Sequence, residues 1–246
     1  MIIAHRGASH DAPENTLAAF RLAWRQGADG IEGDFRLTED GHIVCMHDAT
    51  TRRTTDQNLS VAESTMAQLQ RLDAGSWKGP PWRQERIPTL DQVLATVPQG
   101  KQIFIEVKCG PEILPALKET LKQSRLTAGQ VAVISFDQTV IAEAKRQLPH
   151  LKAFWLTGLK KAETSHALSP TVEEILDILL DLHADGVDLA AHPPIDQHFV
   201  DELGRANKTC HVWTVDDLPR AQWFCALGIE SLTTNQPGWL RQQLKK

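Results

Sequence analysis

Residues 30–46 have the sequence GIEGDFRLTEDGHIVCM, which contains two short β-like runs, Gly30–Phe35 and Ile43–Met46. The intervening Glu39-Asp40-Gly41 is typical of a tight turn, and no segment of helical period separates the two runs. We therefore expect Ile43–Met46 to return antiparallel to the first run, as one arm of a hairpin. This stretch decides how many parallel strands the chain forms.

On either side of this hairpin, β-like runs alternate with amphipathic segments of helical period, a pattern that predicts a parallel sheet with right-handed crossovers. The other runs are Ile2–Ala4, Ile103–Val107, Val131–Ser135, Ala153–Leu156, Gly186–Leu189, Thr209–Val215 and Glu230–Thr233. The helical segments are Thr16–Gln26, Leu90–Val97, Glu112–Gln123, Gln138–Gln147, Thr171–Leu182, Asp196–Ala206, Leu218–Leu227 and Pro237–Lys245.

Without the hairpin arm the runs make eight strands, each followed by a helix, which predicts a (β/α)8 TIM barrel of the α/β class. An open doubly wound sheet is the alternative. That fold usually has a Gly-rich first turn at a nucleotide site, and Gly7 alone does not supply one.

Residues 48–88 break this alternation. They contain paired threonines, the Gly79-Pro80-Pro81 sequence and a helix-like segment, Ala62–Leu72. We interpret them as an excursion over the barrel mouth, where loops commonly carry function. The expected organisation is a single domain, residues 1–246, that carries this small insertion.

The composition limits the class of function. Hydrophobic residues make up 41% of the chain and charged residues 23%, as in a globular protein with a sizeable core. A net charge of −5 argues against a nucleic-acid binder, because no general basic field is present.

No apolar run approaches the roughly 18 residues of a membrane span, and no targeting segment is recognised. We expect a cytoplasmic protein without stable membrane insertion.

Two acids occupy the second strand. Since side chains alternate along a strand, Glu32 and Asp34 point to the same side, among apolar residues and glycine. Two unpaired carboxylates inside a barrel repel each other, and at least one would have its pKa raised. A divalent cation removes this conflict. The competing interpretation is a strand end whose acids face solvent.

The strand Ile103–Val107 repeats the pattern, because Glu106 and Lys108 share one face at its C-terminal end. Three acids at such strand ends converge on the barrel mouth. Oxygen-only ligands suit Mg²⁺ or Ca²⁺ rather than zinc or copper. Lys108 is either a salt-bridge partner of the acids or, as we favour, a cation for a substrate phosphate.

Two histidines follow β-like runs, His5 in His5-Arg6-Gly7 and His47 in His47-Asp48. Two imidazoles can divide general acid and general base catalysis near neutral pH. Arg6 offers a planar fork for phosphate oxygens, and Gly7 would let the backbone pass close to a ligand.

Two further residues have more than one interpretation. Asn15, before the first helix, is expected chiefly as its N-cap, with a contact to the metal region as the alternative. Trp213 either forms a wall of the pocket or packs in the core.

Taken in order, several motifs resemble those of the glycerophosphodiester phosphodiesterase family, in its compact bacterial type. The resemblance is dense over the first 110 residues and resumes at Trp213-Thr214-Val215. The motifs are His5-Arg6-Gly7, Pro13-Glu14-Asn15-Thr16, Glu32-Gly33-Asp34, His47-Asp48 with Arg53-Thr54-Thr55, Asp73-Ala74-Gly75-Ser76-Trp77, Ile87-Pro88-Thr89-Leu90 and Glu106-Val107-Lys108.

This resemblance implies a barrel of the phosphatidylinositol-phospholipase-C-like type and the hydrolysis of glycerophosphodiesters to sn-glycerol 3-phosphate and an alcohol. It implies a divalent metal, Mg²⁺ or Ca²⁺, at Glu32, Asp34 and Glu106. It also implies catalytic roles for His5 and His47 and places Arg6 and Lys108 at the phosphate of a small-molecule substrate.

One departure from the family pattern lies near the C-terminus, where Thr-Asp is usual before a proline and this chain has Thr234-Asn235-Gln236-Pro237. We expect it to affect only the local helix cap. Two alternatives to the implied function remain: a phospholipase D-like or lysophospholipid phosphodiesterase, and a non-catalytic protein that binds phosphodiesters.

Overall fold

The computed structural model describes residues 1–161, 168–191 and 195–245. At its centre is a sheet of parallel strands in the order β1-β11-β10-β9-β6-β5-β4-β2, and pairing of β1 with β2 closes it into a barrel. The predicted eight-stranded barrel is therefore confirmed. Its strands are β1 Ile2–Ala4, β2 Gly30–Leu37, β4 Gln102–Val107, β5 Val131–Ser135, β6 Lys152–Thr157, β9 Gly186–Ala190, β10 Thr209–Trp213 and β11 Ser231–Thr234.

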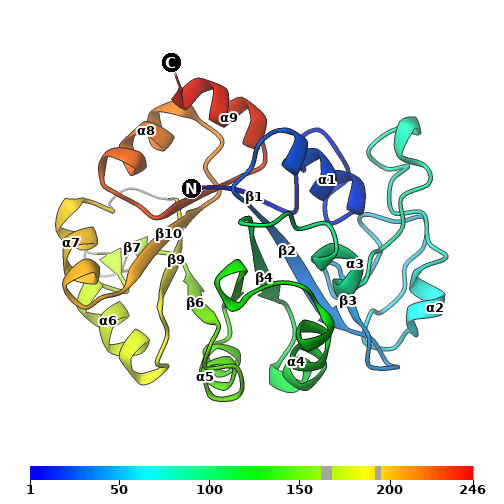
Figure 1. Ribbon diagram of the computed structural model, residues 1–246, viewed down its shortest axis with the longest axis horizontal. Coiled ribbons are helices and arrows are strands. Elements are labelled where there is room, and N and C mark those ends of the chain that lie inside the picture. Colours follow the sequence, from blue (N-terminus) through cyan, green and yellow to red (C-terminus); the bar gives the residue numbers. More distant parts are fainter. Residues whose placement is uncertain (162–167, 192–194, 246) are drawn as a thin grey trace.

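A ring of helices surrounds the barrel (Figure 1). Many begin at a side-chain cap, as when Thr16 accepts a hydrogen bond from the amide of Ala19, which satisfies an N–H that the helix itself leaves free. The ring helices are α1 Leu17–Arg25, α3 Leu90–Leu94, α4 Leu114–Gln123, α5 Gln138–Gln147, α6 Val172–Asp181, α7 Gln197–Arg205, α8 Leu218–Ala226 and α9 Pro237–Leu244.

Hydrophobic residues fill two zones. Large clusters lie between the barrel and its helices, around residues such as Phe20 and Ile31 in one half and Val187 and Leu189 in the other. A smaller cluster occupies the barrel interior: Ile3, Phe104, Ala132, Ile134, Phe154 and Leu156. This inner cluster fills the middle of the barrel. Polar side chains at the C-terminal strand ends therefore lie directly above a hydrophobic layer.

The hairpin arm predicted from residues 30–46 is present as β3, Ile43–Cys45. It pairs antiparallel with β2, with Phe35 opposite Cys45 and Leu37 opposite Ile43. It has one barrel strand as its neighbour and so lies at an edge outside the closed ring.

Residues 48–88 differ from expectation in two respects. The helix predicted over Ala62–Leu72 is only α2, Met66–Leu69. Most of the segment lies beside the barrel next to β3, and none of its residues lines the main cavity at the mouth (Figure 1). The reason is a hydrophobic cluster that anchors it to β3: Val44, Met46, Val61, Met66, Leu69, Leu72, Ala74 and Ile87.

A second hairpin was not predicted. Its strands, β7 (Lys160–Lys161) and β8 (Leu168–Ser169), pair antiparallel outside the barrel. Two residues per strand are too few to show an alternating pattern. Within the described part of the chain, every helix falls short of the length and apolar character needed to cross a membrane.

Candidate active site

A cavity of about 190 Å³ opens at the C-terminal ends of the barrel strands. This is the end at which TIM barrels place their active sites. The residues predicted to form the site are brought together here. Seven of them line the cavity: His5, Arg6, Glu32, His47, Glu106, Lys108 and Trp213. The eighth, Asp34, is fully buried directly beside them.

The three predicted metal ligands form one cluster. Glu32 and Asp34 lie on β2 and Glu106 on the neighbouring β4, where Asp34 and Glu106 are register partners. Each of the three offers a carboxylate oxygen, and these oxygens all lie within 4.8 Å of one another. All three side chains are buried, which excludes the interpretation of acids that face solvent.

Burial and mutual repulsion divide the pKa values of these acids. Burial, followed by the charges of Asp34 and Glu106, raises the pKa of Glu32 well above its ordinary value. Burial and the charge of Asp34 raise the pKa of Glu106 to about 7. Burial acts in the same direction on Asp34, but Lys108 and Arg6 outweigh it and lower its pKa to about 2.

Two cations face this cluster. Lys108 Nζ lies 2.5 Å from Glu106 Oε1 and 3.2 Å from Asp34 Oδ1. Arg6 Nε lies 3.2 Å from Asp34 Oδ2, and the Arg6 backbone N–H donates to Glu32 Oε2 at 2.8 Å. In this structure Lys108 is thus an ion-pair partner of the acids and also lines the cavity.

The donor set fits a hard divalent cation. Buried carboxylate oxygens are normally hydrogen-bonded, yet Glu32 Oε1, Asp34 Oδ1 and Glu106 Oε1 have no hydrogen-bond partner among the described residues. Lys108 is close enough to the last two for ion pairing, but hydrogen-bond geometry is not met. A cation among these oxygens would compensate their charge and supply the missing contacts.

His47 is held by its backbone and its ring. The Met46 amide donates to the Asp34 carbonyl at 2.8 Å, and the Arg36 guanidinium donates twice to the His47 carbonyl. The ring Nδ1 lies 2.6 Å from Asp48 Oδ1. An ionised carboxylate can only accept a hydrogen bond, so Nδ1 carries the proton. Nε2 is then the ring nitrogen that remains free to exchange a proton with a ligand.

His5 has a different partner. Its Nδ1 lies 2.8 Å from Asn235 Oδ1. The Asn235 side-chain amide donates to Asp216 Oδ2, which fixes its oxygen toward His5. His5 Nδ1 is therefore also the protonated nitrogen. Asn235 was expected to affect only a helix cap, and that expectation is wrong, because the side chain orients the ring of His5.

The pKa of each histidine lies below its ordinary value. For His5 the largest cause is burial, and the charge of Arg6 adds to it. For His47 burial is again the largest cause, and the charge of Asp34 and the hydrogen bond with Asp48 oppose it. Both rings therefore favour the neutral form, in which Nε2 can accept a proton, unless a negatively charged ligand enters the cavity.

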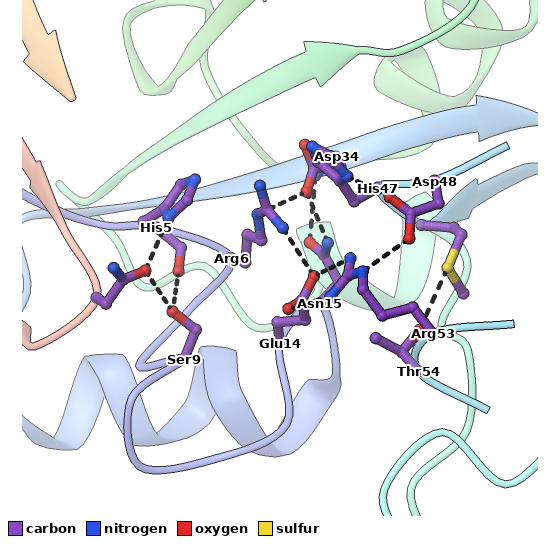
Figure 2. Close-up of polar contacts among 12 residues, drawn as sticks. His5, Arg6, Ser9, Glu14, Asn15, Asp34, His47, Asp48, Arg53 and Thr54 are labelled. Atoms are coloured by element: carbon purple, nitrogen blue, oxygen red, sulfur yellow. Dashed lines mark hydrogen bonds and ion pairs between the residues drawn. The ribbon is translucent and has the colours of Figure 1, made fainter. Parts of the chain in front are cut away.

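A chain of ion pairs connects Arg6 to His47 (Figure 2). Arg6 Nη1 contacts Glu14 at 2.9 Å, Glu14 receives two hydrogen bonds from Arg53 at 2.8 Å each, and Arg53 Nε contacts Asp48 at 2.7 Å. Arg53 is the part of the insertion that reaches the site. Two planar guanidinium groups and two carboxylates fix one another, so Arg6 and Asp48, the partner of His47, are positioned together.

Asn15 was expected to cap the first helix, but it does not. Thr16 is the cap. The Asn15 side chain instead donates to Asp34 Oδ2 at 2.7 Å and accepts from the Asp34 amide at 3.2 Å (Figure 2). The alternative, contact with the metal region, is thus the one that the geometry favours.

Gly7 also differs from expectation. Its φ angle is +80°, and a Cβ at this position would lie 2.6 Å from the backbone carbon of Ala19. Glycine is therefore required for close packing of the β1–α1 loop on helix α1, not for approach to a ligand.

Trp213 lines the cavity and also packs against the inner hydrophobic cluster of the barrel. Its ring makes an edge-to-face contact with Phe136, with centroids 5.6 Å apart, and its Nε1 donates to the Asp188 carbonyl at 3.3 Å. Phe136 is half exposed at the rim. The two rings give the cavity an apolar surface, and Lys108 Nζ lies 5.7 Å from the centroid of the Phe136 ring.

Several residues of the site were not assigned from the sequence. Phe136, Thr233 and Asp188 line the cavity, and Glu14, Arg53 and Asn235 position residues that do. Period-two placement along β9 could have found Asp188, because it sits inward within an apolar strand. Glu14 and Arg53 lie within the quoted motifs but were given no role, and no local pattern marks Asn235.

Comparison with known proteins gives a consistent result. Residues 5–239 match the model of the glycerophosphoryl diester phosphodiesterase family. A glycerophosphodiester phosphodiesterase of Caldanaerobacter subterraneus subsp. tengcongensis is 32% identical, over 100% of this chain and 98% of that protein. One from Bacillus subtilis is 27% identical, over 96% of this chain and 84% of that protein.

Solved structures agree. An Oleispira antarctica phosphodiesterase, solved in complex with the product sn-glycerol-3-phosphate, superposes with a TM-score of 0.88 at 28% identity, covering 100% of this chain and 97% of that one. The fold is also shared with a glycerophosphodiester phosphodiesterase from Thermotoga maritima, with a TM-score of 0.77 at 23% identity over 98% and 96% of the two chains.

Proposed function

Because the chain belongs to the glycerophosphoryl diester phosphodiesterase family, we propose that its barrel-mouth cavity hydrolyses glycerophosphodiesters to sn-glycerol 3-phosphate and an alcohol. Family membership confirms the enzyme class predicted from the sequence. The observation that carries the proposal is the meeting of three acids, two histidines and two cations around a single small cavity. A diester is anionic and inert, so these groups must position it and neutralise developing charge.

Glu32, Asp34 and Glu106 hold a divalent cation in this proposal, Mg²⁺ or Ca²⁺ as their all-oxygen ligand set favours. When bound, such an ion supplies positive charge to the phosphate oxygens. It also removes the mutual repulsion that raises the pKa values of Glu32 and Glu106.

Arg6 and Lys108 bind the phosphate. Both cations line the cavity and are already fixed by buried acids, so little reorganisation is needed when an anion arrives. Arg6 presents a planar fork that matches two phosphate oxygens, whereas Lys108 acts as a point charge.

The two histidines receive different roles from their partners. Asp48 is an anion that stabilises a protonated ring, so His47 is the general acid that protonates the leaving alkoxide. Asn235 is neutral, so His5 remains neutral and acts as the general base toward the nucleophile. The nucleophile is either water or the glycerol 2-hydroxyl, and the second route would release a cyclic phosphate.

A product assay tests the function. The metal-stripped protein is incubated with glycerophosphocholine and glycerophosphoethanolamine, with Mg²⁺, Ca²⁺ or a chelator, and the products are identified by ³¹P NMR. We expect sn-glycerol 3-phosphate only when a divalent ion is present. Full activity in excess chelator, or release of the alcohol monophosphate instead, would refute the proposal. A cyclic intermediate would identify the 2-hydroxyl as the nucleophile.

A lipid substrate is the second candidate, since Trp77 of the insertion is 42% exposed and Lys78 stacks over its ring. Comparing turnover of glycerophosphocholine with that of lysophosphatidylcholine micelles separates the two. We expect the soluble diester to be preferred, because residues 48–88 do not line the cavity.

A further inference from the structure

Asp188 is a buried acid that the proposed mechanism does not use. It lies on β9 with 2% of its surface exposed and lines the same cavity as the catalytic residues. Its Oδ1 has no hydrogen-bond partner, and no bond to its carboxyl is found among the described residues. A buried, unpaired carboxyl is unfavourable unless a ligand or water forms hydrogen bonds with it.

The position of Asp188 is set by barrel topology. In the closed order of strands, β9 lies four positions from β2 in either direction, so Asp188 projects from the wall opposite Glu32. The acids and cations assigned to metal and phosphate come from β1, β2 and β4 and the residues that follow them. A substrate whose phosphate is held there extends across the cavity toward β9.

The surroundings of Asp188 select the kind of group that it meets. Ile134 and Leu156 line the cavity and also belong to the inner hydrophobic cluster, so they close it from below. The leaving alcohol varies among glycerophosphodiesters and must depart, which places it toward the open rim near Phe136. The glycerol half, which all these substrates share, then occupies the closed end of the cavity.

We propose that Asp188 determines specificity by hydrogen-bonding the terminal hydroxyl of the glycerol half of the substrate. The inference rests on the proposed function and deepens it, because it assigns recognition of the glycerol half to β9. A carboxyl can meet a hydroxyl in either protonation state, as acceptor when ionised and as donor when protonated. When the substrate lacks the hydroxyl, the buried Asp188 carboxyl is left without a hydrogen bond, and that substrate binds less favourably.

The test compares two phosphocholine diesters, one of glycerol and one of 1,2-propanediol, which lacks only the terminal hydroxyl. For the wild type we expect kcat/KM to be about 100-fold or more in favour of the glycerol diester. Asp188→Ala should reduce this ratio at least about tenfold, mainly by lowering kcat/KM for the glycerol diester. Asp188→Asn, which still forms hydrogen bonds, should retain a larger part of the preference than Asp188→Ala.

Asp181→Asn is the matched control, because it removes one carboxylate at the exposed end of α6, outside the cavity. Its ratio should equal that of the wild type. An unchanged ratio in both Asp188 variants, with the wild type active on the glycerol diester, would overturn this inference alone. A wild type without activity on either diester would overturn the proposed function itself. If Asp188→Ala does not fold, the ratio measured for Asp188→Asn decides, and equality with the wild type overturns the inference.

Discussion

At the residue scale, the roles proposed for the two histidines rest on the chemical difference between their partners. His47 faces the carboxylate of Asp48, and His5 faces the carboxamide oxygen of Asn235. A carboxylate stabilises an imidazolium by its negative charge. A carboxamide oxygen is uncharged and accepts a hydrogen bond from either the neutral or the charged ring. The assignment of His47 as general acid depends on this difference.

Leaving-group dependence tests the assignment. With a glycerophosphodiester of p-nitrophenol, the leaving group needs little protonation, so His47→Ala should recover most of the rate that it loses with glycerophosphocholine. His5→Ala should remain about 100-fold or more impaired with both substrates, because the nucleophile still needs a base. Equal losses for both variants on both substrates would contradict the assignment.

The pH dependence of Asp48→Asn gives an independent check. Burial already lowers the pKa of His47, and Asp48 opposes that effect. Removing its charge should lower the pKa further. A general acid is active when protonated, so the alkaline limb of the kcat/KM profile should move about one pH unit lower. Glu63→Gln, an exposed residue of the insertion, should leave the profile unchanged. A shift to higher pH would be contrary to the account.

The sequence identified the residues that bring charge to the site but not those that orient them. Glu32, Asp34 and Glu106 could be found because alternation along apolar strands places them on one face. Asn235 is far from His5 in the chain and occurs where an ordinary helix cap is expected, so no local pattern marks its contact. Asn15 was interpreted as a cap because Asn often is one, and tertiary contact with Asp34 prevailed.

At the element scale, the β1–α1 loop carries His5 and Arg6. It can pack closely against helix α1 because Gly7 has no side chain. Gly7→Ala would place a Cβ 2.6 Å from the backbone of Ala19 at a φ of +80°. We expect a loss of about 2–4 kcal/mol in the free energy of unfolding, together with lowered activity, because the loop must shift.

Gly41→Ala is the control for that prediction. Gly41 has the same φ of +80°, but a Cβ added there would meet no atom within 4 Å, so this variant isolates backbone strain from the clash. Its expected cost is about 1 kcal/mol, with activity unchanged. Urea unfolding of both variants measures the difference, and equal costs would show that packing on Ala19 is unimportant.

The order of strands and helices could be predicted well, whereas the insertion could not. Apolar runs of three to eight residues and amphipathic helices have strong periods, and the Glu39-Asp40-Gly41 turn correctly separated β3 from the barrel. In residues 48–88 the hydrophobic residues are sparse and serve one small cluster against β3. Such a cluster follows no period, so helix length and placement depend on tertiary packing.

At the scale of the whole molecule, the barrel concentrates three acids in one buried place, and this has a consequence for stability. The pKa of Glu106 is raised to about 7 in the folded protein by burial and by Asp34, from an ordinary value of 4.5. A raised pKa on an acid means that its contribution to stability is fully present below about pH 4.5 and is lost as pH rises through 7. The lowered pKa of Asp34 acts below pH 4, outside this window.

The metal-stripped protein should therefore lose thermal stability between about pH 4.5 and 7 relative to a Glu106→Gln variant, whose side chain does not ionise. Added Ca²⁺ or Mg²⁺ should raise the Tm of the wild type by a few degrees at pH 8 and much less at pH 5, where protons compete for the same oxygens. Thermal scans at both pH values measure this, and a metal effect larger at pH 5 would be inconsistent with the cluster.

The proposed function requires a divalent ion held by Glu32, Asp34 and Glu106. The most direct measurement is an anomalous difference map from crystals grown with Mn²⁺ and sn-glycerol 3-phosphate. The account predicts one strong peak among these carboxylates at ligand distances of roughly 2.0–2.6 Å, with the phosphate between that peak, Arg6 and Lys108. A map without density at the three carboxylates, from protein shown to be active under the same conditions, would contradict it.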